Sequence, residues 1–531
     1  MIRQIIRILS SWTLIMLIPL TAGAQVVPQP LQNTGIYRFI DELAAAGVVS
    51  VNSSIKPYSR KEIADWLSTA FENKESLTPR QQKELSFYLR DFGKEAGNFG
   101  DRGRRTDLLY YSDELFTITV NPIAGGEVLL NSAGHATYLR NGAEAHATLN
   151  NFGFYASLRD NHEKPLLGSP EYLTRRPGGH IKAGTDWSDM RAGISYQWKW
   201  GSIAFVNDGL QWGSGYNGTN IFSDRVPPFF QYRLNLRPAK WLDFNYFHGA
   251  LKSMVVDSTR SYTVTNSYGT DYREVYHTKY IAANMFTFMP FERLRISAGN
   301  SIIYSDYGVN PAFLIPFLFF KSVDHSMNSG IDNMNSQMFF DISSHQVKNI
   351  HLYATLFIDE LSVYRFTDPD AWNFFSYKAG AALYNLPLDN LSLTAEFTYT
   401  YPLTFRHYVP TLTFESNRYN LGHYLTDNAR EWFLSLNYRP LRTLDLKLWF
   451  SDAVRGPDYT LLGGPRVGNP PLETIEWSNR SAGLSFDYQV INDLYLWFSL
   501  THSNITGDDS LTPVFFRGSR TTISLGVTAG F

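Results

Sequence analysis

Aromatic and arginine side chains recur together in the long glycine- and proline-rich stretches of this sequence. Aromatic rings stack on the C–H faces of sugar rings, and arginine hydrogen-bonds hydroxyl groups and uronate carboxylates. The mixture therefore suits binding of an acidic or neutral polysaccharide. For any single residue, packing of a loop on itself is the simpler interpretation, whereas the whole group favours a binding surface. The candidate polysaccharide-binding residues are Trp212, Tyr216, Arg225, Arg406, His407, Tyr408, Tyr459, Arg466 and Trp477.

No residue pattern predicts catalysis, a metal site or a cofactor. The acidic pairs Asp359-Glu360 and Asp508-Asp509 fall where strands or loops are expected to end, so a solvated role is preferred to acid–base chemistry. His135 and His146 are not at metal-ligand spacing, and no H-E-x-x-H motif occurs. We therefore expect a protein that is not an enzyme. A spatial cluster of loop residues is the alternative that sequence leaves open.

The composition excludes several classes of protein. Of the 531 residues, 15% are aromatic and only 18% are charged, which is the opposite of a disordered chain. The absence of cysteine excludes a disulfide scaffold and a thiolate metal site. A formal charge of −2 gives no electrostatic footprint for nucleic acid. The aromatic residues must fill a soluble core or face lipid.

The first 24 residues predict a secretory signal peptide. Arg3 and Arg7 precede an apolar run from Ile8 to Leu20, and Ala22-Gly23-Ala24 places small residues before Gln25. A membrane anchor is the alternative, but the run is too short to span a bilayer. Beyond it, the best candidate for a spanning helix, residues 307–320, has 14 uncharged residues and is broken by Pro311 and Pro316. An exported chain without a spanning helix is either soluble or a β-barrel.

Residues 25–106 predict a small helical bundle followed by a linker. Apolar residues at helical spacing give three amphipathic helices within residues 33–93, with Gly47 in position to cap the first. Capping boxes at residues 59–62 (SRKE) and 78–81 (TPRQ) predict where the second and third helices begin. Residues 93–106 carry four glycines and three arginines and indicate the linker.

Residues 107–531 alternate with period 2 and predict an outer-membrane β-barrel. Ile523, Leu525 and Val527 alternate with Thr522, Ser524 and Gly526, and residues 391–400 and 444–450 repeat the pattern. A soluble sandwich would also alternate, but strands near ten residues with aromatic ends favour a sheet between lipid and water. The inward positions are then polar, at Asp243, Asn245, Arg293, Arg295, Glu396, Asp445 and Lys447.

Turn residues set the number of strands at 18. Short connections are predicted at residues 150–151, 198–201, 237–240, 289–292, 345–349, 386–390, 439–442 and 491–493. Long stretches lie between them at residues 160–189, 207–228, 252–274, 305–333, 401–429, 452–477 and 503–518. Short turns at one rim and long loops at the other are typical of bacterial outer-membrane barrels, in which the short turns are periplasmic.

The order of signal peptide, small bundle and barrel resembles the Wzi capsule-assembly family of outer-membrane proteins, in the form common in the Bacteroidetes. The residues that carry the resemblance are 37–43 (YRFIDEL), 57–62 (PYSRKE), 150–155 (NNFGFY), 210–215 (LQWGSG) with Pro227-Pro228, 301–304 (SIIY) with Asn310-Pro311, 357–361 (FIDEL), 393–401 (LTAEFTYTY) and 421–427 (LGHYLTD). Each motif is short, and their shared order covers nearly the whole mature chain. The family's loops vary most, so no sugar-contacting residue carries over.

The resemblance implies a non-catalytic surface lectin that holds capsular or exopolysaccharide at the outer face. It also implies a periplasmic bundle that stabilises or closes the base of the barrel and contacts export or assembly proteins. Two alternatives stay open. A barrel of this size could be a diffusion channel, or it could be a scaffold for an assembly, motility or export complex.

Overall fold

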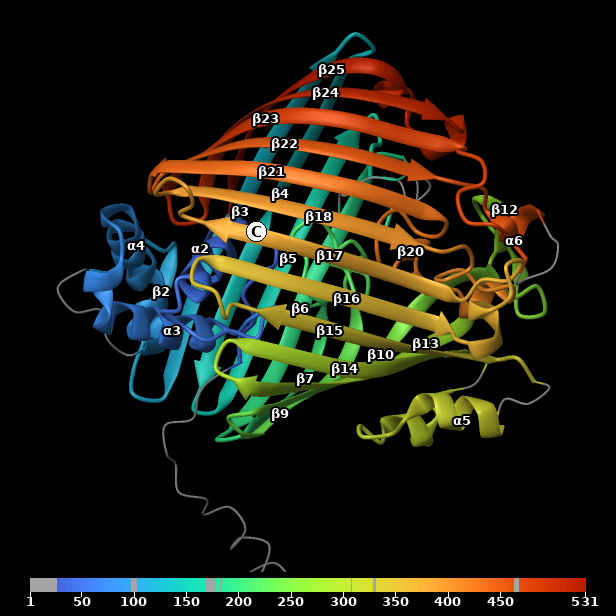
Figure 1. The fold of residues 1–531 in the computed structure, drawn as a ribbon, viewed down its shortest axis with the longest axis horizontal. Helices are drawn as coiled ribbons and strands as arrows, with labels where there is room; N and C mark the ends of the chain where they lie inside the picture. The colour runs from blue at the N-terminus through green and yellow to red at the C-terminus, as the bar shows by residue number, and fades with distance from the viewer. Residues whose placement is uncertain are drawn as a thin grey trace, which may run out of the picture.

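The computed structural model describes residues 26–96, 103–168, 173, 177–181, 184–306, 308–327, 331–462 and 468–531. The predicted signal peptide lies outside these residues, as does Arg466. A closed cylinder of strands makes up most of the chain, with three N-terminal helices at one end of it (Figure 1). We call this end the helix end and the opposite end the loop end.

The three predicted helices are present and begin where their capping residues indicated. They are α2 (Thr34–Ala45), α3 (Arg60–Glu72) and α4 (Pro79–Ala96). Ser59 and Glu62 form a reciprocal capping box at the start of α3, and Thr78 and Gln81 form one at α4. Gly47 ends α2 with a φ of +78°. The apolar stripes meet in one buried cluster that includes Ile36, Phe39, Ile40, Leu43, Ile63, Leu67, Leu85, Leu89 and Phe92.

Helix α4 extends past Gly93, where the sequence predicted a linker to begin. Lys94 pairs with Asp107 at 2.7 Å, and Glu95 pairs with Arg60 of α3. These buried ion pairs hold the last turn of the helix in place and outweigh the low helix propensity of glycine. The linker prediction was therefore wrong for residues 93–96. None of the helices in the described part of the chain is long and apolar enough to cross a membrane.

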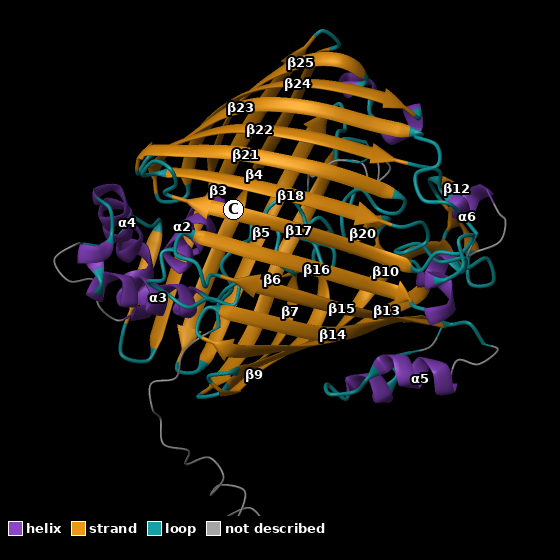
Figure 2. Ribbon diagram, viewed as in Figure 1, coloured by secondary structure: helices purple, strands orange, loops and turns teal. Residues whose placement is uncertain are grey.

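Eighteen antiparallel strands form the closed barrel, as the turn count predicted (Figure 2). Each strand pairs with the next one along the chain, and the last pairs with the first from Ile523↔Leu130 to Ala529↔Ala124. The short strand β2 (Leu109–Ser112) extends the pairing along β3 beyond the end of β25. The barrel strands are β3 (Phe116–Asn131), β4 (Gly134–Leu149), β5 (Phe152–Lys164), β6 (Asp186–Trp198), β7 (Gly201–Asp208), β9 (Phe229–Ala239), β10 (Leu242–Val256), β13 (Tyr276–Phe291), β14 (Leu294–Ser305), β15 (Met334–Ser344), β16 (Ile350–Glu360), β17 (Phe374–Tyr384), β18 (Leu391–Thr400), β21 (Ala429–Leu441), β22 (Leu444–Arg455), β23 (Trp477–Ile491), β24 (Leu494–Gly507) and β25 (Gly518–Ala529).

The eight predicted short turns all join neighbouring strands at the helix end, and the seven predicted long stretches lie at the loop end. Two further connections at the loop end, residues 132–133 and 361–373, were not predicted. The first is a tight two-residue turn, and the second contains the short 3₁₀ helix η5 (Val363–Phe366). One long loop carries its own hairpin, β11 (Tyr262–Asn266) with β12 (Gly269–Arg273).

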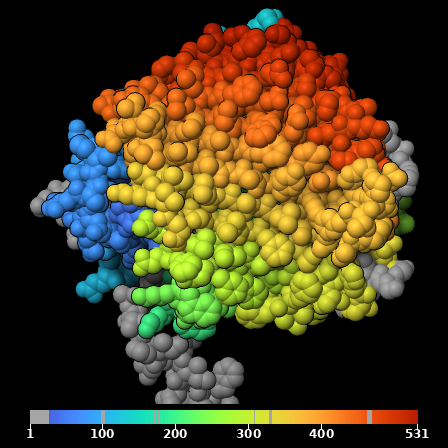
Figure 3. Space-filling view, in the orientation of Figure 1, coloured from blue at the N-terminus to red at the C-terminus, as the bar shows by residue number. Residues whose placement is uncertain are grey.

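The two faces of the wall differ as the period-2 pattern requires. Exposed apolar side chains of one parity cover the outer face, among them Leu139, Leu158, Ile194, Phe205, Leu434, Leu448, Leu496 and Leu525. The opposite parity carries the predicted lumen residues, and several of these contact segments inside the barrel. Asp243 accepts a hydrogen bond from Asn52 at 3.1 Å, and Asp445 pairs with Arg38 of α2. On the face seen in Figure 3, the wall is a continuous surface with the N-terminal helices at one end.

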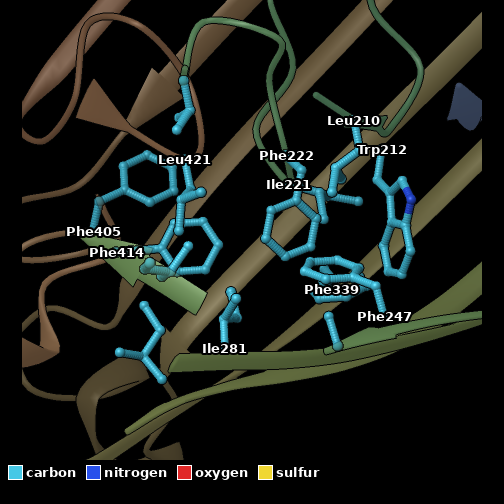
Figure 4. Packing of buried hydrophobic residues seen from close by; sticks show 14 of the residues in the cluster. Leu210, Trp212, Ile221, Phe222, Phe247, Ile281, Phe339, Phe405, Phe414 and Leu421 are labelled. Atoms are coloured by element: carbon cyan, nitrogen blue, oxygen red, sulfur yellow. The ribbon is translucent and has the colours of Figure 1, made fainter. Parts of the chain in front are cut away.

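A long loop folds back into the barrel and fills the lumen. We call residues 209–228 the lumen plug. Its short strand β8 (Gln211–Trp212) pairs with β1 (Ile55–Lys56) of the N-terminal segment, so two segments inserted from opposite ends meet inside the barrel. The rings of Trp212 and Phe222 pack edge-to-face at 5.3 Å, between the wall residues Phe247 and Phe339 (Figure 4).

Ion pairs fix the N-terminal helices to the rim of the barrel. Arg439, near the helix end of β21, pairs with Glu84 of α4 and, at 3.5 Å, with Glu42 of α2. Arg105 pairs with Asp493 of the β23–β24 turn at 2.5 Å. These contacts lie on separate strands of the rim, so the helices are held as one body against the barrel.

Replacing Phe222 by alanine should destabilise the protein by about 3–5 kcal/mol, because it opens a cavity in a packed aromatic cluster. Guanidinium unfolding of the barrel in detergent micelles, followed by tryptophan fluorescence, measures this loss. Tyr268→Ala is the matched control, since Tyr268 is 98% exposed in the β11–β12 hairpin. It should change the free energy of unfolding by less than about 0.5 kcal/mol. Equal effects of the two substitutions would contradict a packed plug.

Candidate functional site

Three carboxylates on the lumen face of the wall hold the plug. Asp341 of β15 accepts the N–H and the hydroxyl of Ser214 at 2.8 and 3.0 Å. Glu396 of β18 accepts the N–H groups of Tyr216 and Asn217 at 2.7 and 2.9 Å. The third, Glu431 of β21, accepts the Asn217 amide at 2.8 Å. Hydrogen bonds to ionised acceptors are the strong class, so the plug has a defined position instead of a loose fit.

A cavity of about 500 Å³ remains in the lumen between the plug and the wall strands β3–β6, β24 and β25. Pro177 and Gly178, from the loop between β5 and β6, also line it. We call it the lumen cavity and define it by six of the aromatic and charged wall residues that line it, Tyr138, Arg140, Arg159, Trp187, Asp189 and Trp497. Its size is that of a small-ligand site.

The aromatic residues of the lumen cavity are held in fixed positions. The rings of Tyr138 and Trp187 lie 6.2 Å apart at an interplanar angle of 24°. Trp187 donates its indole N–H to Asp189 at 3.3 Å, and the amide of Asn161 donates to the same carboxylate oxygen at 3.1 Å. Gly179 lies against the Trp187 ring, where a Cβ would come within 2.3 Å of the indole nitrogen. Only glycine therefore lets this loop pass so close to the ring.

Two polar atoms in the lumen cavity are shielded from water and have no hydrogen-bond partner among the described residues. They are Nε of Arg159 and Oδ1 of Asp189. Leaving such atoms unpaired costs free energy, and both of these side chains line the lumen cavity. Arg191 differs, since its guanidinium is already paired with Asp208 at 2.5 Å.

This arrangement suits recognition and contains no assembled catalytic group. Parallel aromatic faces with an arginine and a carboxylate beside them can stack on a sugar ring and hydrogen-bond its hydroxyl groups. Within the described ranges, no group of three or more His, Asp or Glu side chains is placed to hold a metal ion.

Four of the candidate residues lie inside the protein, although the sequence placed them in surface loops. Trp212, Tyr216 and Arg225 belong to the plug; the Tyr216 hydroxyl hydrogen-bonds His351 at 2.8 Å, and Arg225 donates to the Tyr424 carbonyl at 3.1 Å. Trp477 is 1% exposed and donates its indole N–H to Thr512 at 2.8 Å. Their surface location was wrong, because the loops fold inward and bury their rings. Whether any of them contacts polysaccharide stays a prediction.

The structure brings four other candidates together at the loop end. Arg406 pairs with Asp458 at 3.1 Å, which sets its loop beside Tyr459. His407 and Tyr408 lie with ring centroids 4.4 Å apart, and Tyr408 is 55% exposed. Tyr459 donates its hydroxyl to the Pro470 carbonyl at 2.9 Å. We call Arg406, His407, Tyr408 and Tyr459 the rim group.

The lumen cavity itself was missed by the search for loop residues. Its residues are spread over strands far apart in the sequence, and each one resembles ordinary polar lining. One signal was present: Arg140, Arg159 and Asp189 fall on the inward parity of three successive strands near their loop-end halves. Charged residues at neighbouring inward positions of successive strands indicate a candidate binding site and not only the polar lining of a water-filled lumen.

No protein-family model and no curated protein matches the chain. Among solved structures, it is similar to Wzi of Escherichia coli, an outer-membrane protein involved in group 1 capsule assembly and a carbohydrate-binding β-barrel. The TM-score is 0.59 at 13% identity, and the match covers 96% of this chain and 100% of Wzi. OccD3 of Pseudomonas aeruginosa matches with a TM-score of 0.44 at 10% identity over 80% of this chain and 94% of OccD3, which is too weak to compare the folds.

The likeness to Wzi shows the fold alone, and it agrees with the geometry described above. A closed 18-stranded barrel with an apolar exterior is a barrel of the outer membrane. The fold class predicted from the sequence is therefore confirmed, and the fold is Wzi-like.

The loop that carries the rim group should be more stable at mildly acidic pH. Asp427 accepts the N–H groups of Phe405 and Arg406 at 2.7 and 2.8 Å, and burial raises its pKa to about 6. Because this pKa exceeds that of the unfolded chain, the contribution is fully present below about pH 4 and is lost as pH rises through 6. We expect residues 401–428 to resist hydrogen exchange more at pH 5 than at pH 7.5, after correction for intrinsic rates. Asp427→Asn should remove this difference, and a difference that survives in the variant would assign it to another group.

Proposed function

We propose that the protein is a non-catalytic outer-membrane lectin that binds capsular or exopolysaccharide and helps to attach or organise it at the cell surface. The observation that carries the proposal is the lumen cavity, in which stacked rings, an arginine and a carboxylate line a space of ligand size. The fold shared with a carbohydrate-binding barrel supports it. Membership of the Wzi family, and of its Bacteroidetes form, stays a prediction.

In this proposal the loop end is extracellular and the helix end is periplasmic. The signal peptide (1–24), the bundle and linker (25–106) and the barrel (107–531) are the corresponding units. The bundle would close the base of the barrel through its ion pairs with the rim and present its free face to export or assembly proteins. No cofactor or nucleic acid takes part.

The rim group and the lumen cavity would act on the polymer in succession. In this proposal Arg406, Tyr408 and Tyr459 meet it first, with His407 buried beside Tyr408. Arg466, which lies outside the described residues, is a further candidate. A terminal sugar or side branch can then enter the lumen cavity. One weak site on each of many barrels is enough to retain a long repeating polymer, because later contacts are intramolecular.

The filled lumen disfavours the diffusion channel, one of the two alternatives. The plug meets the N-terminal segment across the lumen, and three wall carboxylates hold it there. An accessory scaffold would use the same fold with no need for sugar binding, so the binding experiment below separates the two proposals.

Purified protein should bind the surface polysaccharide of the producing strain, and Trp187→Ala should weaken that binding roughly 10-fold because it removes the stacking face. Arg159→Ala tests the polar half of the lumen cavity in the same way. Trp241→Ala, in an exposed turn at the helix end, is the matched control and should leave binding unchanged. Absence of binding by the unaltered protein, with normal capsule in a deletion strain, would favour the scaffold.

The unaltered protein should show little conductance in planar bilayers. Replacing residues 210–226 with a short Gly-Ser linker should raise the conductance to porin size, since it removes the plug while leaving the wall intact. Shortening the loop between β10 and β13, whose hairpin lies outside the lumen, is the control and should have no effect. A large conductance in the unaltered protein would support the channel instead.

A further inference from the structure

One loop-end segment lies on the outside of the barrel wall. We call residues 308–327 the outer clip; it contains the 3₁₀ helix η4 (Pro311–Leu314) and helix α5 (Phe320–Met327). Its residues Phe313 and Phe320 pack in one cluster with Phe244, Ala282 and Ile302 of the wall. The neighbouring wall positions of opposite parity, Phe247, Ile281 and Ile303, belong instead to the buried lumen cluster that includes the plug residues Trp212 and Phe222. Successive strand residues point to opposite faces, so the clip is outside, as α5 is in Figure 1.

The outer clip reaches far down the lipid-facing wall. The ring of Phe317 stacks on Phe244 with centroids 4.6 Å apart, and Phe244 is the third residue of β10 from the helix end. Asn284, which also contacts the clip, lies in the middle of β13. Because the apolar band of such barrels is about 25 Å tall, the clip lies beside lipid and not above it.

Polar wall side chains satisfy the backbone of the clip. The Asn284 amide donates to the carbonyls of Pro316 and Leu318, both at 2.9 Å. Asn300 accepts the N–H of Phe320 at 2.7 Å, and the Tyr246 hydroxyl donates to the Phe313 carbonyl at 2.7 Å. Irregular backbone in a membrane and asparagine on a lipid-facing wall are both costly when unpaired. Here the wall side chains pair the backbone groups of the clip, and the clip in turn pairs the asparagine side chains of the wall, so neither is left unpaired beside lipid.

The outward side of the clip is apolar over residues 314–319, whereas Ser322, His325 and Ser326 are exposed polar residues of α5. Leu314, Ile315, Phe317 and Phe319 are between 44% and 58% exposed, and Pro311 and Pro316 contribute no N–H groups. A groove of about 760 Å³ lies beside it on the outer wall, lined by Ala147, Ala156, Ala192, Phe205, Phe230 and the clip residue Val309. Small residues between bulky rings leave this depression in the outer wall. The two surfaces are continuous with each other and with the lipid-facing wall.

We propose that the outer clip is embedded in lipid, and that its exposed side chains and the adjacent groove contact the acyl chains of membrane lipids. The occupant is lipid and not a second copy of the chain, because the exposed side chains of residues 314–319 are apolar and lie on the lipid-facing wall, whose polar groups already pair the carbonyl groups named above. The clip shares no residue with the lumen cavity, so this proposal stands or falls independently of polysaccharide binding.

The absence of cysteine allows the proposal to be tested with single labels. Phe317→Cys and, as a second site, Phe319→Cys are labelled with a nitrobenzoxadiazole fluorophore, and the full chain is inserted into dioleoylphosphatidylcholine vesicles. Leu496→Cys, on the uncovered outer wall, is the lipid control, and Tyr268→Cys is the water control. We expect acyl-brominated phosphatidylcholine to quench the clip labels as strongly as the Leu496 label, while aqueous iodide quenches only the Tyr268 label.

Two results would overturn the proposal. Iodide quenching of both clip labels, equal to that at Tyr268, would show that the clip lies in water. Protection of both clip labels from iodide and from the brominated lipid would show that protein covers the surface, and cross-linking would then identify a second copy. Quenching of either clip label by the brominated lipid alone supports the proposal even where the other variant fails to fold.

Discussion

The closed barrel uses nearly all the backbone hydrogen bonds of its wall, and this constraint governs how every other segment attaches. A closed sheet has no free edge to which another strand could add, except where β3 extends past β25 and pairs with β2. Segments inside, outside and at the rim must therefore be held by side chains of the wall. The plug is bound by Asp341, Glu396 and Glu431, and the helices by rim residues such as Arg439. Inserted segments form strand pairs with each other, as β1 does with β8.

The lumen face and the outer face of the wall hold these segments with different types of side chain. In the lumen, carboxylates bind the plug, and Lys378 at 3.1 Å from Glu396 compensates one of these charges. On the outer face a charge beside lipid would be far more costly, and the neutral amides of Asn284 and Asn300 do the same work for the outer clip. Charged side chains therefore hold the segment on the lumen side of the wall, and neutral amides hold the segment on the lipid side.

Local patterns in the sequence predicted the strands of the wall and the helices, but they did not predict where the long loops pack. Period 2, the turn residues and the capping boxes each act within a few residues, so they could be recognised one at a time. The position of Trp212 depends on a partner at Ile55 and on wall rings more than 30 residues further along the chain. No local pattern encodes such contacts. Asn284 and Asn300, which interrupt the apolar parity of neighbouring strands, were the sequence signal for the outer clip.

Closure of the lumen and formation of the candidate sugar site are one structural event. Gly209, Asp224 and Val226 of the plug line the lumen cavity opposite Tyr138 and Trp187 of the wall. Arg191, which also lines it, is held by Asp208 at the base of the plug. A barrel that opened by releasing the plug would lose one side of the cavity, while the Arg191–Asp208 ion pair between the wall strands β6 and β7 would remain. The proposed binding in the lumen and free diffusion through it are therefore mutually exclusive in this fold, and the buried plug cluster favours the closed lumen.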